Sequence, residues 1–237
     1  MKVCCIGDIH GTDKFLKCYD KIIKKDNDCD KIIVFGDHFD PYEKNIHFHD
    51  MIDNYIKFTE IMNKDERVIS LLGNHDLSSY IIQLDKTNRT LKWKTGAAQI
   101  SRHIRNNLNK SYLCYRINDY LFSHAGVSET WFNNLKVIYQ KRLLDNYIGW
   151  TDSELYNLVS FYPYDKSHWG DDPNQGCTWI RPESLINNPY GDYNQVVAHT
   201  REDVYQKIKM SNDKDLWMVD TKGNPDYLTL DIKSEEK

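Results

Sequence analysis

The chain has 237 residues, a net charge of −4, 28% charged residues and 40% hydrophobic residues. This mildly acidic balance argues against a general nucleic-acid-binding protein, because such proteins normally present a basic face. The length suits one large domain or two small ones, and the hydrophobic fraction is enough for a sizeable core.

Membrane and secretory signals are missing from the sequence pattern. No apolar run approaches the roughly 20 residues of a membrane-spanning helix, and the apolar "VCCI" after Lys2 is too short for a secretory signal. The six cysteines show no CxxC spacing, which is typical of reduced thiols in an intracellular protein. We therefore expect a cytoplasmic protein that does not engage membranes.

The first third of the chain alternates between strand and helix patterns. Apolar runs at 2–8, 31–37 and 67–76 indicate strands, and each of them reaches a glycine followed by polar residues. Between them, 13–25 and 49–62 carry apolar residues at helical spacing. This alternation predicts an α/β core with parallel strands, in which ligands bind at the carboxyl ends of the strands.

The remaining two thirds are less regular. Residues 77–110 indicate a helical insert, and 112–126 indicate two short strands joined by a turn at Asn118 and Asp119. A helical pattern then continues to about Tyr147, and the aromatic, turn-rich stretch 148–176 is a candidate substrate-selecting loop. Residues 191–200 indicate a strand that ends in His199, and 215–220 with 226–232 indicate a closing hairpin.

Five of the predicted strand ends carry the same chemistry. They read "GDIHG", "GDHFD", "GNHD", "SHAG" and "AHT". Imidazole and carboxylate ligands together favour zinc, iron or manganese over calcium, and a carboxylate able to bridge two ions is what a two-metal hydrolase needs. The side chains concerned are Asp8, His10, Asp37, Asp40, Asn74, His75, His124 and His199.

The order and spacing of these motifs resemble the calcineurin-like metallophosphoesterases, and within them the phosphoprotein-phosphatase branch, which includes small bacterial and phage phosphatases and dinucleoside-tetraphosphate hydrolases. The segment "TWIRPE", residues 178–183, is similar to the W-x-R segment of that branch. The resemblance implies an α/β fold of four αββα layers, in which two mixed sheets are flanked by helices. It also implies that residues 1–237 form a single domain.

The resemblance also implies a role for each motif residue. Asp8 and His10 would bind the first metal ion, and Asp37 would bridge the two ions. Asn74, His124 and His199 would bind the second ion. His75 would act as general acid, and Asp40 would orient it, as carboxylates behind catalytic histidines do.

Two phosphate-binding arginines of the branch are missing from this chain. The branch usually has Arg and Gly after the second Asp of the second motif, where this chain has Pro41 and Tyr42, and it usually has Arg where this chain has Leu72. Arg181 in "WIRP" matches the remaining phosphate-binding arginine of the branch. Arg201 is a second candidate, without support from the resemblance.

Simpler roles compete with some of these assignments. Asp40 could cap the turn at Pro41, and Arg181 could form a structural ion pair. We expect His38 to be structural, because neighbouring residues at a strand end point apart, and Asp76 to support or cap its neighbours. His47 and His49 are expected at the surface, and His168, Asp171 and Asp172 fall in the aromatic loop.

The function that we predict is hydrolysis of a phosphomonoester, of the phosphoserine or phosphothreonine kind, by a hydroxide held between two metal ions. Manganese is the favoured metal, with iron and zinc as alternatives, and the predicted partner is a phosphorylated substrate. The first alternative is a phosphodiesterase or dinucleoside-polyphosphate hydrolase, because a substrate with less charge at phosphorus needs fewer arginines. The second is a non-catalytic, metal-stabilised binding module on the same fold.

Overall fold

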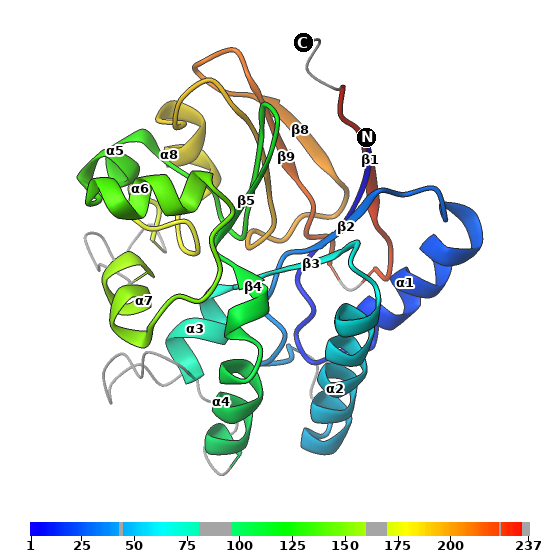
Figure 1. The fold of residues 1–237 in the computed structure, drawn as a ribbon. Helices are drawn as coiled ribbons and strands as arrows, with labels where there is room; N and C mark the ends of the chain where they lie inside the picture. Colours follow the sequence, from blue (N-terminus) through cyan, green and yellow to red (C-terminus); the bar gives the residue numbers. More distant parts are fainter. Residues whose placement is uncertain (43–44, 81–95, 160–169, 223, 234–237) are drawn as a thin grey trace.

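Two mixed sheets form the centre of the molecule. A computed structural model describes residues 1–42, 45–80, 96–159, 170–222 and 224–233, and its fold is shown in Figure 1. Within these ranges the strands make two five-stranded sheets, in the orders β10-β1-β2-β3-β4 and β5-β6-β7-β9-β8. The predicted α/β sandwich of two mixed sheets flanked by helices is therefore confirmed.

The first sheet contains the parallel core that the sequence indicates. Its strands are β1 (Lys2–Ile6), β2 (Lys31–Val34), β3 (Val68–Leu71), β4 (Ser111–Tyr112) and β10 (Leu228–Asp231). β1 to β4 run parallel to their neighbours, whereas β10 pairs with β1 in the antiparallel sense. Helices α1 (Lys14–Lys25) and α2 (Phe48–Lys64) connect the first three strands.

The second sheet contains β5 (Cys114–Ile117), β6 (Tyr120–Ser123), β7 (Asn194–Val197), β8 (Gln206–Lys209) and β9 (Asp215–Met218). The predicted turn between β5 and β6 is present, with Asn118 at a φ of 51° and Ile117 paired with Tyr120. β6, β7 and β9 run parallel to one another, and the antiparallel strands β5 and β8 lie at the two edges.

The period of two along each strand divides the core into layers. In β1, Val3 and Cys5 belong to the apolar cluster between the sheets, together with Phe122 and Val196 of the second sheet. The alternate residues of β1, Cys4 and Ile6, contact the helical side instead. That side holds α1 and α2 through Phe15, Ile22 and Met51, among other buried residues.

Helices cover the outer face of the second sheet and one end of the molecule. They are α3 (Asn74–Tyr80), α4 (Ala97–Arg105), α5 (Glu129–Asn134), α6 (Val137–Leu144), α7 (Asp152–Val159) and α8 (Pro182–Asn187), with a 3₁₀ turn at Leu108–Lys110. Leu185 of α8 packs on Val197, Leu216 and Met218 of the second sheet. Of the predicted helical insert 77–110, the described residues include the end of α3, all of α4 and the 3₁₀ turn, and 81–95 lie outside the described residues.

Two expectations about local structure are wrong. Residues 215–220 and 226–232 do not pair as a hairpin, because β9 joins the second sheet and β10 joins the first. After β9 the chain stays with the second sheet long enough for the N–H of Val219 to bond the carbonyl of Val197, and then it crosses between the sheets. The stretch 148–176 is also not a loop throughout, since α7 buries Leu155, Leu158 and Val159. His168 lies outside the described residues.

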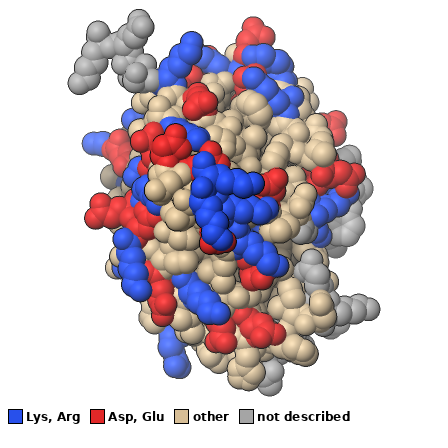
Figure 2. Space-filling model, turned by 90° about the vertical axis from the view of Figure 1, so that its right-hand side faces the viewer, with Lys and Arg blue, Asp and Glu red and all other residues tan. Residues whose placement is uncertain are grey.

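The surface around α1 carries both signs of charge. Figure 2 shows basic side chains gathered near the centre of this face and acidic side chains around them. Lys17 pairs with Asp13, and Lys24 pairs with Asp20, in each case one helical turn apart. Among the described helices, none combines the length and the apolar character that crossing a bilayer demands.

Candidate metal centre

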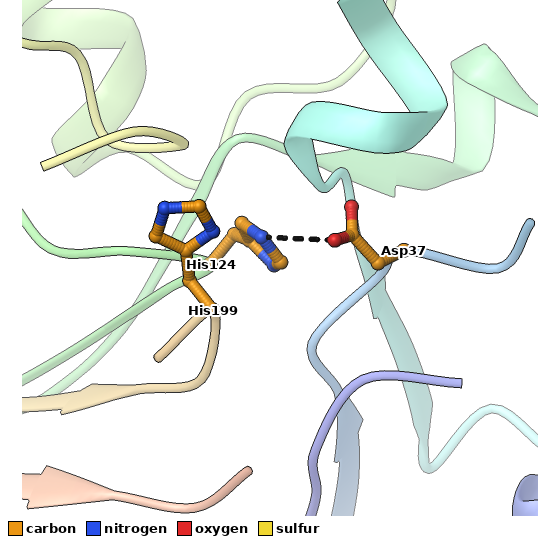
Figure 3. Close-up of side chains that lie close together, drawn as sticks. All are labelled: Asp37, His124 and His199. Atoms are coloured by element: carbon orange, nitrogen blue, oxygen red, sulfur yellow. Dashed lines mark ion pairs between the residues drawn. The ribbon is translucent and has the colours of Figure 1, made fainter. Parts of the chain in front are cut away.

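The strand ends of both sheets meet at one buried site. Asp8 and His10 follow β1, Asp37 and Asp40 follow β2, and Asn74 begins α3 just beyond β3. The second sheet brings His124 after β6 and His199 after β7. All seven side chains belong to residues that are no more than 7% exposed. Figure 3 shows Asp37, His124 and His199 gathered from different strands.

Close approach of the backbone segments makes this meeting possible. The N–H of His10 donates to the carbonyl of Asp37 at 2.6 Å, and the N–H of Gly11 donates to the carbonyl of His38 at 2.8 Å. A Cβ at Gly73 would clash with the carboxylate of Asp37. Glycine after the third strand is therefore required sterically, because any side chain there would displace a central carboxylate.

Several site residues have an uncommon backbone conformation. The φ angles of His10, Asp37, Asp40 and His199 lie between 46° and 60°, in the left-handed region that non-glycine residues rarely adopt. Such conformations cost of the order of 1–3 kcal/mol each and persist where the surroundings enforce them. The fold thus holds these four residues in place at some expense of stability.

Two groups of candidate ligands share one carboxylate. Asp8, His10 and Asp37 place ligand atoms within 4.8 Å of one another, and so do Asp37, His124 and His199. Nε2 of His10 lies 3.7 Å from an oxygen of Asp8 and 3.7 Å from one of Asp37. Nε2 of His124 lies 3.5 Å from the same Asp37 oxygen. The position of Asp37 is the one that a bridging ligand needs.

Asn74 also reaches this cluster. Its Oδ1 lies 2.9 Å from Nε2 of His124. In addition, the N–H of His199 donates to Oδ1 of Asp8 at 3.4 Å. The structure thus brings together all six side chains that the sequence suggests as metal ligands, in one group on each side of Asp37.

Hydrogen bonds to carbonyl oxygens orient two imidazole rings of the cluster. Nδ1 of His10 faces the carbonyl oxygens of Phe39 and Asp40, at 3.2 and 2.9 Å, and Nδ1 of His124 faces the carbonyl oxygen of Phe35 at 2.7 Å. Because a carbonyl only accepts, each Nδ1 carries the proton and each Nε2 keeps its lone pair. This arrangement is usual behind metal-binding histidines.

Two buried nitrogen atoms test whether a metal fits. Nε2 of His10 and Nε2 of His199 are buried and have no hydrogen-bond partner within the described part of the chain. A buried polar atom without a partner is costly, and a metal ion would give both nitrogens one. The donor set of imidazole, carboxylate and amide oxygen fits transition metals.

The electrostatics of the cluster favour the same conclusion. Burial lowers the pKa of His199 well below its ordinary value, and the charge of Arg181 adds to this effect, so the ring is neutral. Burial also raises the pKa of Asp37, and the charge of Asp8 contributes in the same direction. A neutral imidazole and two carboxylates that repel each other form a site that a cation would stabilise.

His75 and Asp40 form a pair beside the cluster. Nδ1 of His75 lies 3.1 Å from Oδ2 of Asp40, and the ring centroids of His75 and His10 are 5.2 Å apart. Burial alone would lower the pKa of His75, but the charges of Asp37, Asp40 and Asp8 together raise it to about 9. A raised pKa favours the protonated imidazole, which is the form that can donate a proton.

A cleft of about 130 Å³ gives access to these groups. Arg181 precedes α8 and donates through Nη1 to the carbonyl of His199 at 3.3 Å and to Oγ1 of Thr200 at 3.1 Å. These bonds place the guanidinium beside the second ligand group. The described residues that line the cleft are Asp37, Tyr42, Asn74, His75, Trp179, Arg181 and His199.

Among the described residues, the remaining histidines and Asp76 lie outside the two groups of candidate ligands. The ring of His38 packs on Phe58 at 4.5 Å, and its Nδ1 lies 3.2 Å from Oδ2 of Asp76. Asp76 also accepts the backbone N–H groups of His38 and Gly73. His38 and Asp76 thus brace the loops behind the cluster, whereas His47 and His49 are exposed.

Three contacts near the site escape sequence reasoning. The ring centroid of Tyr42 lies 4.2 Å from that of His10, and the guanidinium of Arg201 lies over the Tyr42 ring at 4.3 Å. Lys14 and Asp220 form a buried ion pair at 3.3 Å, although 206 residues separate them in the sequence. Nothing in the spacing of residues links partners so far apart.

Comparisons with known proteins agree with this geometry. The model of the calcineurin-like phosphoesterase family matches residues 1–228, whereas a search of curated proteins found no match. Among solved structures, a mutant form of a cold-active protein tyrosine phosphatase has 19% identity and a TM-score of 0.57, over 92% of this chain and 70% of that one.

A second solved structure, the cold-active protein-tyrosine phosphatase of a psychrophilic Shewanella species, has 18% identity and a TM-score of 0.53, over 91% of this chain and 70% of that one. At such identities the likeness shows the fold alone. The family match is stronger evidence than these structural likenesses, because it spans every strand end that contributes to the cluster. The chain therefore belongs to the calcineurin-like phosphoesterase family, a family of dinuclear metal-dependent hydrolases.

Proposed function

We propose that the protein is a phosphomonoesterase of the phosphoprotein-phosphatase branch, acting on substrates of the phosphoserine or phosphothreonine kind. The observation that carries this proposal is the shared position of Asp37 between two groups of candidate ligands, with the His75–Asp40 pair beside it. A site of this kind suits in-line displacement at phosphorus.

Asp8, His10 and Asp37 would hold one ion, and Asp37, Asn74, His124 and His199 would hold the other. Manganese is our favoured metal, with iron and zinc as the alternatives that fit the same ligands. When bound, two such ions supply a nucleophile at neutral pH and neutralise charge on the phosphoryl oxygens.

The residues of the chain itself position and protonate the substrate. Arg181 donates from the rim of the cleft to the oxygens of the reacting phosphate, for which its planar fork is suited. His75 transfers its Nε2 proton to the departing oxygen, while Asp40 accepts from Nδ1 and keeps the ring oriented. The buried setting strengthens both interactions.

The first experiment compares p-nitrophenyl phosphate with bis-p-nitrophenyl phosphate, in Mn²⁺ and with a chelator. We expect release from the monoester that the chelator abolishes. If a protein with bound metal released nothing from either compound, the proposed function would be wrong. Asp20→Asn, at an exposed residue that pairs with Lys24, is the control for a general effect of charge removal.

A second candidate function is a phosphodiesterase or dinucleoside-polyphosphate hydrolase. It is favoured by the surroundings of the two departures from the branch. Leu72 is 3% exposed and packs in the apolar core, so this position offers no cation to a phosphate. The ring of Tyr42 contacts that of His10. Release from the diester alone would decide for this candidate.

A further inference from the structure

Tyr42 separates the cleft from a second cavity. The second cavity has a volume of about 530 Å³, within the usual range for small-molecule sites. Asp8 and His10 line it, so it adjoins the metal centre, and Tyr42 lines both the cavity and the cleft. Arg181 lines the cleft only, and Arg201 lines the cavity only. Each space therefore has its own arginine.

The guanidinium of Arg201 stacks on the ring of Tyr42. Its guanidinium carbon lies 4.3 Å from the centroid of the Tyr42 ring, and that ring is 4.2 Å from the ring of His10. A guanidinium stacked on an aromatic ring keeps the N–H groups at its edge available for a carboxylate or a phosphate. Two consecutive ring contacts thus link Arg201 to a candidate metal ligand.

The described lysines that line the cavity already have partners. Lys14 pairs with Asp220 at 3.3 Å in a buried position, and Lys17 pairs with Asp13 at 2.9 Å. No carboxylate of the described ranges forms an ion pair with Arg201. The capacity of the cavity to bind an anion is therefore concentrated at Arg201.

Acidic groups limit where an anion can lie. Asp50, in the first turn of α2, lines the cavity without an ion-pair partner among the residues described, and Asp8 belongs to the candidate metal cluster. An anion is repelled by Asp50 and attracted by Arg201. It is therefore expected at the Tyr42 side of the cavity, next to the metal centre.

We propose that this cavity is a substrate-selecting subsite in which Arg201 binds a second anionic group of the substrate, a carboxylate or a further phosphate. The reacting phosphate lies in the cleft with His75 and Arg181, and Tyr42 holds Arg201 at the boundary. This inference rests on the proposed phosphoesterase function and adds its substrate class, namely phosphoesters that carry a second anion.

The test compares phenyl phosphate with 3-carboxyphenyl phosphate on the metal-loaded full chain. The measured quantity is the ratio of their kcat/KM values. In the wild type we expect the carboxylated compound to be favoured about tenfold or more, as for a charge-assisted hydrogen bond. In Arg201→Ala the ratio should fall to about one. Arg201→Lys should give an intermediate ratio, because lysine keeps the charge without the planar fork.

Matched variants separate binding from folding. Arg142 lies over the Tyr147 ring at 4.5 Å and lines neither cavity, so Arg142→Ala removes a stacked arginine elsewhere and should leave the ratio unchanged. Tyr42→Phe keeps the aromatic ring on which Arg201 stacks and should keep the ratio. Tyr42→Leu removes that ring and should lower the ratio. Circular dichroism verifies the fold of each variant.

Two further pairs of substrates identify whether the second anion is a carboxylate or a phosphate. A phosphoserine peptide with acidic neighbours and its neutral counterpart test a carboxylate source. A nucleoside diphosphate and its monophosphate test a phosphate source. A loss of preference in Arg201→Ala that is confined to one pair assigns the subsite to that source.

The outcomes distinguish the subsite from the function. If the wild type hydrolyses all substrates with ratios near one that Arg201→Ala does not change, the subsite is refuted and the function stands. If metal-loaded wild type hydrolyses nothing, the function is refuted. In that case calorimetry compares the affinities of 3-carboxyphenylphosphonate and phenylphosphonate. Equal affinities in the wild type would refute the subsite. A preference for the carboxylated compound that is lost in Arg201→Ala would support it.

Discussion

The backbone N–H of His75 donates a hydrogen bond of 2.8 Å to Oδ1 of Asp37, whose other oxygen faces His10 and His124. The candidate acid is thus tied to the candidate bridging ligand through its own main chain. Because α3 begins at Asn74, this bond also fixes the start of the helix relative to the cluster. Changes at Asp37 should therefore affect metal binding and proton transfer together.

Asp37→Asn tests the bridging role. The amide keeps the size of the side chain but removes the charge that two cations need, so we expect loss of at least one metal. Activity should fall by more than about 100-fold, the upper end of what changes behind a metal ligand cost. Metal content by mass spectrometry and kcat on p-nitrophenyl phosphate measure both effects. Full metal content in this variant would argue against a bridge.

His75→Asn separates proton transfer from metal binding. Both metals should remain, because the side chain belongs to neither ligand group. The rate should fall by about 10²–10⁴-fold for alkyl phosphates, whose leaving groups need a proton, and less for p-nitrophenyl phosphate. The check is kcat across a series of leaving groups. Equal losses across the series would contradict the general-acid role.

Arg181→Ala tests the phosphate clamp. We expect KM to rise and kcat to fall together, by about 2–4 kcal/mol in total, because in the proposed role the guanidinium would contact the phosphate in both the ground state and the transition state. Arg181→Lys should recover part of this loss. Steady-state kinetics give both constants. Unchanged values of KM and kcat would contradict a phosphate-binding role for Arg181.

Metal removal should lower stability as well as activity. An ion that binds only the folded state adds about 2.7 kcal/mol at a free concentration of 100 times its Kd. Thermal unfolding should therefore shift to lower temperature with chelator, and addition of Mn²⁺ should reverse the shift. Asp37→Asn is the internal comparison, since its unfolding should respond much less to either reagent.

Asp65 provides a pH dependence remote from the site. Hydrogen bonds from Arg67, at 2.7 to 3.2 Å, lower the pKa of the Asp65 carboxyl to about 2, against a smaller opposing effect of burial. A pKa that is lower in the folded state stabilises the protein above the ordinary carboxyl pKa of about 3.9, and this contribution is lost as pH falls from there through about 2. Urea midpoints of wild type and Asp65→Asn should therefore differ at pH 7 and converge towards pH 2. A constant difference over that range would contradict the assignment.

Local signals in the sequence were strong enough to predict the parallel core. Short apolar runs that end at Gly7, Gly36 and Gly73 indicate strands with ligating residues at their carboxyl ends, and the structure places those ends together. Gly73 is informative because its lack of a side chain makes room for Asp37. The candidate ligands of the first sheet could be grouped for the same reason, since parallel topology collects strand ends at one edge. For His124 and His199, which follow strands of the second sheet, the ligand role is what the family resemblance implies.

Sheet membership could not be predicted in the same way. The sequence pattern indicates one strand over 112–117, yet Tyr112 belongs to β4 of the first sheet and Cys114–Ile117 form β5 of the second, with Leu113 buried between them. The sequence pattern does not indicate β8, because this edge strand contains a single apolar residue, Ile208. Which sheet a short strand joins depends on distant partners, and no local pattern records them.

The contacts around Tyr42 lie beyond sequence reasoning for a related reason. Arg201 and Tyr42 belong to segments far apart in the chain, and a cation–π contact between such segments produces no recognisable spacing in the sequence. The same is true of Lys14 and Asp220. Comparison with the branch could mark Pro41 and Tyr42 as unusual, but only the fold shows that Tyr42 stands between two cavities.

The candidate ligands come from both sheets, and this has a consequence for how the chain unfolds. Asp8 and His199 lie 191 residues apart, yet they meet in one cluster. Ions shared between these ends would act as cross-links that close a very long loop, and the entropy that a cross-link removes from the unfolded chain grows with loop length. Metal would then fasten the two halves of the sandwich to each other much as a disulfide does, in a protein whose described cysteines are all free.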